Sequence, residues 1–186
     1  MSTTEVATAA PVAGRKRIVV RVLGGLGALA FAAFWVWALF FASKEPINQI
    51  GDTLWAERAE QICADAEQDR LALADFREMQ GASAQLVRER ADIVDRATDV
   101  IEEMLDDVVA VAPDDAKGRA LVPQWEAEYR IYIGDRRAFA DRLRETGEND
   151  PFYESQAEGL PISERLETFA GDNHMPSCAP PRDLTR

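Results

Sequence analysis

One long uncharged stretch, residues 22–42, constrains the fold of this chain more than any other feature of its sequence. It holds 21 residues, all of them apolar or small. A helix rises about 1.5 Å per residue, so a helix of this length spans the hydrocarbon core of a bilayer, which is roughly 30 Å thick. The sequence therefore predicts a transmembrane helix within residues 18–43 and a lipid bilayer as its first partner.

The charge before the span predicts its orientation. Basic residues that flank a span stay on the cytoplasmic side of the membrane, and four of them precede this one: Arg15, Lys16, Arg17 and Arg21. Residues 1–17 are therefore expected inside, as a disordered tail too poor in large apolar side chains to fold. Residues 44–186 are expected outside the cytoplasmic membrane, as one domain long enough to bury a core.

A cleaved secretory signal is the alternative interpretation of the same stretch. The apolar region of such a signal is about 7–15 residues long, and small residues occupy the first and third positions before the cut. A cut after Ala42 would place Phe40 at the third position, and a cut after Ser43 would place Phe41 there. Both cuts fit poorly, which favours an uncleaved anchor.

Small residues recur along one face of the span. Gly24, Ala28 and Ala32 are spaced four residues apart, and this spacing lets a second transmembrane helix approach closely. We interpret them as a packing face for another copy of the chain or for a membrane or envelope protein partner. Glycine and alanine are also common in spans that contact lipid alone, so that alternative stays open.

The domain outside the span is strongly acidic. Four of the 21 basic residues and one of the 33 acidic residues precede the span, which leaves 17 basic and 32 acidic side chains after it and a net charge of −15. Nucleic-acid binding depends on basic patches that neutralise phosphates. We therefore expect no nucleic-acid partner.

Apolar residues after the span recur every three to four positions, which is the periodicity of one helix face. The pattern predicts an all-α fold, in which the transmembrane helix is followed by an extracytoplasmic antiparallel bundle of three long helices and a short fourth. Pro123 and Gly134 are expected to start, kink or interrupt the third helix. The four helices are expected at residues 55–79, 83–112, 122–146 and 162–170.

The two cysteines are expected to form a disulfide. Cys63 lies on the first helix of the bundle and Cys178 in the C-terminal tail. The space outside the cytoplasm is oxidising, and an even number of cysteines there favours a bridge. Three long helices that alternate in direction, followed by a short helix running back, would bring Cys178 to the level of Cys63. Two free buried thiols are the alternative.

Three charged residues interrupt the apolar helix faces at one level of the expected bundle. Asp69 falls in a gap of the first helix, Arg90 in a gap of the second and Arg136 in a gap of the third. We interpret them as a polar layer in which Asp69 pairs with Arg90 or Arg136, and as the best candidate for binding an anionic ligand. The alternative is that the arginines bury only their stems and keep their charged heads in water.

The sequence offers no arrangement of residues typical of catalysis. His174, the single histidine, lies four residues before Cys178, but zinc needs three or four ligands and no others cluster nearby. No serine–histidine–aspartate pattern and no glycine-rich phosphate loop is evident. We therefore assign no catalytic residue, no metal and no cofactor, and expect a protein that is not an enzyme. A set of carboxylates on the second helix is interpreted as a solvated face: Glu102, Glu103, Asp106 and Asp107.

Three segments of the outer domain carry a resemblance to other sequences. They are WAERAEQICADAE (residues 55–67), YIGDRRAFADRL (132–143) and NHMPSCAPP (173–181). With the basic-flanked anchor, they make the chain similar to uncharacterised single-span membrane proteins of high-GC actinobacteria. No segment is a motif with assigned chemistry, so the resemblance implies a compartment and a fold but no activity.

Two functions remain open at this point. The sequence favours a structural or accessory interaction protein whose acidic bundle docks on another envelope protein. The alternative is an extracytoplasmic ligand-binding or sensory module whose signal is carried by a membrane partner. A deep, partly polar pocket between the helices would favour the alternative.

Overall fold

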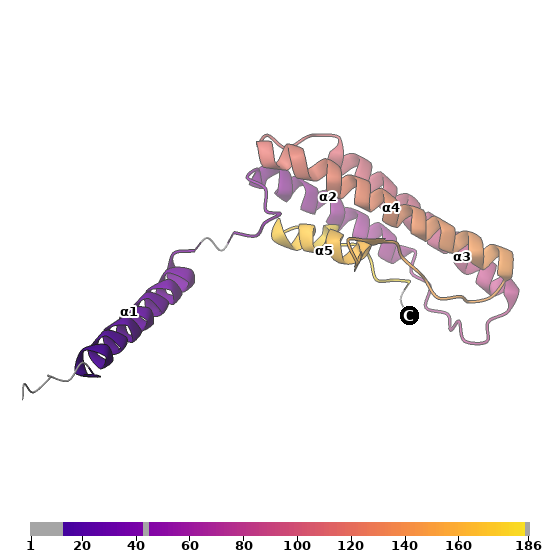
Figure 1. The fold of residues 1–186 in the computed structure, drawn as a ribbon. Helices are drawn as coiled ribbons and strands as arrows, with labels where there is room; N and C mark the ends of the chain where they lie inside the picture. The colour runs from indigo at the N-terminus through magenta and orange to yellow at the C-terminus, as the bar shows by residue number, and fades with distance from the viewer. Residues whose placement is uncertain (1–12, 43–44, 185–186) are drawn as a thin grey trace, which may run out of the picture. The chain divides into compact units, whose positions relative to one another are not determined.

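The computed structural model describes residues 13–42 and 45–184, and almost all of its regular structure is helical (Figure 1). The chain divides into two compact units, Met1–Glu45 and Pro46–Arg186. Most of the predicted tail, residues 1–12, lies outside the described residues. The rest of that prediction is wrong, because the first helix already begins at Ala13.

The described residues of the first unit form the helix α1 (Ala13–Phe40). Its segment Ile18–Phe40 has 23 residues and a mean hydropathy of 2.0, so it is long and apolar enough to cross a membrane. Its side chains from Ile18 onward are exposed along nearly the whole helix. The segment therefore has the length and surface that a lipid environment requires.

In the second unit, the described residues 46–184 form four helices, one short 3-10 turn and a pair of two-residue strands. Helix α3 packs along α4 (Figure 1), α2 packs on α3, α5 packs on α4, and η1 packs back onto α2. The elements thus close around a shared interior. Their bounds are α2 (Thr53–Ala72), α3 (Ala84–Val109), α4 (Ala116–Thr146), β1 (Gln156–Ala157), β2 (Leu160–Pro161), α5 (Ile162–Asp172) and η1 (Pro176–Cys178).

Helix α2 ends seven residues before the predicted helix does. It stops at Ala72, and the rest of the expected helix belongs to a loop, residues 73–83, in which the Phe76 side chain is 90% exposed. The Asp75 carboxylate accepts a hydrogen bond from the backbone N–H of Arg77 at 3.0 Å. Such local bonds from a side chain to the backbone compete with helix formation, which gives a physical reason for the early end.

Helix α4 begins earlier than expected and continues without a break. Asp115 caps its first turn, and both Pro123 and Gly134 lie inside the helix. A proline inside a helix costs about 3 kcal/mol. Burial of Val122 and Trp125 on either side of Pro123 offsets this cost. Helices α3 and α5 lie where the sequence predicted them, and the small β1–β2 pair was not expected.

Two aspartates join the starts of α2 and α4. Asp52 accepts hydrogen bonds from the backbone N–H groups of Trp55 (3.0 Å) and Asp114 (2.9 Å). Asp115 accepts them from Gly118 (2.9 Å) and from Asp52 itself (3.2 Å). Each side chain therefore caps its own helix and also binds the segment that leads into the other one.

These bonds make the folded state sensitive to acid. The N–H of Asp114 is the main cause that lowers the pKa of Asp52 below its ordinary value of 3.8. Burial opposes ionisation of Asp115, but the backbone N–H groups of Gly118, Gly51 and Asp52 outweigh it and lower its pKa as well. A carboxyl group whose pKa is lower in the folded state stabilises the fold above its ordinary pKa, and this stability is lost as the pH falls through the lowered value.

We expect the unfolding temperature of the full chain in mild detergent to fall as the pH drops below about 4. Asp52→Asn keeps a capping oxygen but cannot ionise, so its unfolding temperature should fall less over the same range. Asp69→Asn, at an exposed position on α2, serves as the control and should follow the wild type. Circular dichroism melts from pH 7 to pH 2.5 measure all three, and identical acid slopes would contradict the role of the caps.

Candidate functional site

The apolar interior of the second unit is interrupted by a layer of buried polar side chains. Arg136 of α4 and Thr98 of α3 are both fully buried, at 0% exposure. They lie between two separate apolar clusters of the core. The larger cluster includes Trp55, Leu105, Tyr129 and Leu166. The smaller cluster comprises Val87, Ala91, Val94, Phe139, Ala140, Leu143 and Leu184.

The buried guanidinium of Arg136 is held by a carboxylate from the C-terminal tail. Its Nη1 and Nη2 donate to the two oxygens of Asp183 at 2.7 and 3.1 Å, and its Nε donates to the hydroxyl oxygen of Thr98 at 3.0 Å. A two-point contact of this kind is among the strongest that arginine makes. Burial favours the neutral form of both groups, but their pairing outweighs it. The pairing raises the pKa of Arg136 and lowers the pKa of Asp183.

The predicted pairing of Asp69 is wrong. Asp69 is exposed on the last turns of α2, and among residues 45–184 it forms no ion pair with Arg90 or Arg136. The expected helix 55–79 placed Asp69 near mid-bundle, whereas the observed α2 ends three residues after it. Asp183 takes the place assigned to Asp69, and sequence reasoning missed it because no periodic pattern marks the tail.

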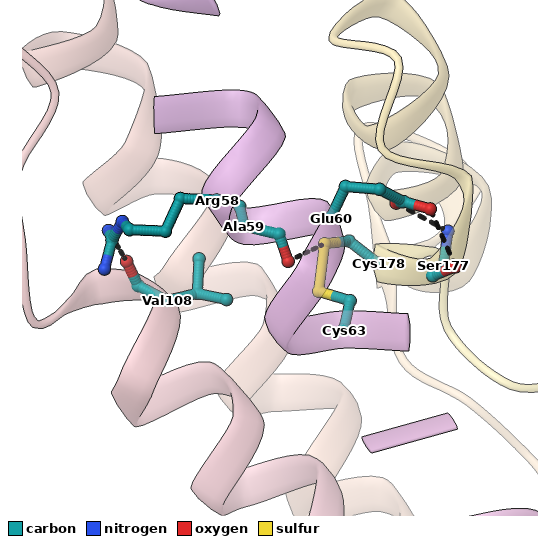
Figure 2. Close-up of a disulfide and its surroundings, with 7 residues drawn as sticks. All are labelled: Arg58, Ala59, Glu60, Cys63, Val108, Ser177 and Cys178. Carbon is teal, nitrogen blue, oxygen red and sulfur yellow. Dashed lines mark hydrogen bonds between the residues drawn. A yellow bond between two sulfur atoms is a disulfide. The ribbon is translucent and has the colours of Figure 1, made fainter. Parts of the chain in front are cut away.

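The disulfide attaches this tail to α2 (Figure 2). Cys63 is bonded to Cys178, as the sequence predicted. Next to the bridge, the backbone N–H and the hydroxyl of Ser177 donate to the Glu60 carboxylate at 3.0 and 2.8 Å. These contacts attach two successive tail residues to α2 and position Asp183 five residues further along.

Figure 2 also shows how α2 is held on its other side. Nη2 of Arg58 donates to the carbonyl oxygen of Val108 at 2.9 Å, which links α2 to the end of α3. The segment of α2 that carries Cys63 is therefore bound to the tail on one side and to α3 on the other.

A groove of 630 Å³ lies next to the buried Arg136–Asp183 pair, and Asp183 is one of its lining residues. It forms where α2 has ended while α3 and α4 continue, and its walls come from the end of α2, the 73–83 loop, α3 and the tail. Its apolar walls include Leu71, Leu73, Phe76, Met79, Ile93 and Leu184. Its charged residues are Arg70, Arg77, Arg90, Asp75 and Asp183.

The three arginines of the groove differ in how fully their donors are used. Arg77 pairs with Asp75 at 2.8 Å and with Glu89 at 2.7 Å, and its hydrogen bonds are the main cause that lowers the pKa of Asp75. Nη1 of Arg70 lies 3.7 Å from the Asp183 carboxylate. Within the described part of the chain, half-buried Arg90 has no hydrogen bond or ion pair, although its charge helps to lower the pKa of nearby Asp75. The groove therefore carries a net positive charge and one arginine with unused donors.

The other residues singled out in the sequence lie away from the groove. His174 is exposed and has a left-handed backbone, with φ of 58°. Glu102 and Asp106 on α3 form ion pairs with Arg137 and Arg130 of α4, at 3.0 and 2.8 Å. No group of three or more metal-ligating side chains occurs among the described residues.

Gly24, Ala28 and Ala32 are exposed on α1. Nothing described lies within 4 Å of the place where a side chain on Gly24 would begin.

None of the protein-family models, curated proteins or solved structures compared with this chain matches it. The resemblance to single-span actinobacterial membrane proteins therefore stays a prediction, and the function must be argued from the groove itself.

Proposed function

We propose that this chain is a single-pass membrane protein that carries an antiparallel helical bundle outside the cytoplasmic membrane and binds a small ligand in its groove. A partner protein in the membrane then transmits the binding signal to the cytoplasmic side. The observation that supports this proposal is the groove of 630 Å³, with its apolar walls and its unused Arg90 donors. Ligand pockets have volumes of about 300–1000 Å³ and mostly apolar walls with a few polar groups.

The groove can be tested by filling it. Ala74 is an exposed groove residue on the 73–83 loop, so Ala74→Trp should obstruct the groove without disturbing the core. The probe is the neutral dye N-phenyl-1-naphthylamine, added to the full chain in phosphatidylcholine nanodiscs, with the signal of empty nanodiscs subtracted. We expect wild-type protein to bind one dye per chain and Ala74→Trp to bind it at least tenfold more weakly.

Ala110→Trp is the matched control, because Ala110 is exposed at the end of α3 and does not line the groove. It should bind the dye as the wild type does. Equal binding by wild type and Ala74→Trp would contradict a binding function for the groove.

The orientation has its own test. Basic residues before the span place the N-terminus in the cytoplasm, so a cysteine at Glu145, exposed near the end of α4, should react in intact cells with a membrane-impermeant maleimide. A cysteine at Thr8 should react only after permeabilisation. The native cysteines are bonded to each other and buried, so they contribute no background. The reverse labelling pattern would show that the orientation is wrong.

An accessory protein that docks on another envelope protein is the second candidate. The exposed small-residue face of α1 favours it, because such a face permits close packing against another transmembrane helix. Ala28→Leu should then remove a partner, or a second copy of the chain, from crosslinked complexes isolated in mild detergent. Ala30→Leu, about 200° around the helix from Ala28, should leave the same crosslinks in place. Unchanged crosslinking in Ala28→Leu would contradict this candidate.

A further inference from the structure

The cation that faces the groove from α3 is available to a ligand. Arg77 is already paired with two carboxylates, and Arg70 lies beside Asp183. Half-buried Arg90 interacts only at longer range with Asp75, and in the described part of the chain it forms no hydrogen bond or ion pair. A guanidinium presents five N–H donors in a planar fork that suits the oxygens of a carboxylate or a phosphate. An anionic group is therefore the chemistry that would satisfy Arg90.

The wall of the groove that α2 and the 73–83 loop contribute is largely apolar, in contrast to the charged Arg90 on α3. Phe76 is 90% exposed and Leu71 is 57% exposed, and both line the groove together with the partly buried Leu73 and Met79. When another apolar group covers large apolar side chains that are this exposed, the free energy of the system falls. An alkyl chain would cover them and would fill space that is continuous with the guanidinium.

The charge of the groove contrasts with the rest of the domain. Residues 44–186 carry a net charge of −15, whereas the groove contains three arginines and two aspartates. Anions are repelled by most of this acidic surface, so an anion that binds here does so through local contacts. The ligand must therefore combine an anionic group with an apolar body.

We propose that the groove binds an amphiphile with one alkyl chain and an anionic headgroup, with Arg90 contacting the headgroup and the Phe76 wall covering the chain. This inference rests on the binding function proposed above and names the class of its ligand. Free fatty acids and single-chain phosphate esters share this chemistry. The experiment distinguishes the two sources by their headgroups.

The test uses the full chain in phosphatidylcholine nanodiscs and isothermal titration calorimetry, with empty nanodiscs titrated in parallel. The three probes are decanoate, decyl phosphate and the neutral decanol. We expect at least one of the two anions to bind at least tenfold more tightly than decanol. The tighter of the anions identifies the headgroup as a carboxylate or a phosphate.

Substitutions then assign the contacts. Arg90→Gln should weaken binding of the preferred anion at least tenfold and leave binding of decanol unchanged. Arg96→Gln, exposed on the same helix but outside the groove, is the matched control and should change neither. Each methylene added to the chain should strengthen binding by up to about fourfold in the wild type, and by less in Phe76→Ser. Phe76 is exposed, so the melting temperature of Phe76→Ser should stay that of the wild type.

The outcomes separate this inference from the proposed function. Decanol that binds as tightly as both anions, or an Arg90→Gln variant that binds them normally, would overturn the headgroup assignment and leave a groove that binds apolar ligands. If none of the three probes binds and Ala74→Trp also leaves dye binding unchanged, the binding function itself is contradicted.

Discussion

Removing the disulfide with Cys63→Ala and Cys178→Ala together should lower the free energy of unfolding by about 2–5 kcal/mol, the largest effect that we expect from any change in this chain. The bond closes a loop with a sequence separation of 115 residues. In the chain-entropy account, such a loop greatly restricts the unfolded chain, and its loss allows the unfolded state far more conformations. Denaturant unfolding of the full chain in mild detergent measures the difference.

Two controls accompany this measurement. Non-reducing and reducing gels of alkylated protein extracted from membranes should differ in mobility, because the native bond must be present for its loss to matter. Ser177→Ala removes one hydrogen bond to Glu60 and keeps the disulfide, so it should cost only about 1 kcal/mol. Alkylation of both thiols without prior reduction would show that the disulfide is absent from the native protein.

Asp183→Ala should lower the free energy of unfolding by about 2–4 kcal/mol, because it leaves the Arg136 guanidinium buried without its partner. The side chain of Asp183 is 31% exposed, so water reaches the site and keeps the loss below that of a fully buried pair. The same substitution at exposed Asp69 is the control, and it should cost well under 1 kcal/mol. Thermal and denaturant melts compare the two variants with the wild type.

A double variant separates the lost pairing from any general damage to the tail. Arg136→Met replaces the buried charge with an apolar chain of similar length, so Asp183→Ala combined with Arg136→Met should recover most of the stability that Asp183→Ala loses. Equal losses in the single and double variants would show that Asp183 stabilises the fold in some way other than by pairing with Arg136.

The effects of removing the disulfide and of Asp183→Ala are also expected to be coupled. Cys178 lies five residues before Asp183, and the disulfide holds this part of the tail against α2. Without the disulfide the tail is less constrained, so Asp183→Ala should cost less in the cysteine-free protein than in the wild type. The combined loss should therefore be smaller than the sum of the two separate losses.

Local patterns in the sequence were sufficient for several elements. The apolar stretch defines the candidate span of α1, because the total hydropathy of a helix depends only on its own residues. The apolar periodicity predicted the positions of α3 and α5 for a similar reason, because the apolar residues on the buried face of a helix recur every three to four positions. The disulfide was predictable because only two cysteines are present to pair.

The tertiary structure alone decided the continuity of α4 and the partner of Arg136. Packing on both sides carries α4 through Pro123, whereas the early end of α2 has a local cause in the bond from the backbone of Arg77 to Asp75. Asp183 reaches Arg136 from a tail that the disulfide holds against α2, and the two cysteines are 115 positions apart in the sequence. Periodicity is a property of neighbouring residues, whereas the groove and its unpaired Arg90 depend on segments far apart in the sequence coming together.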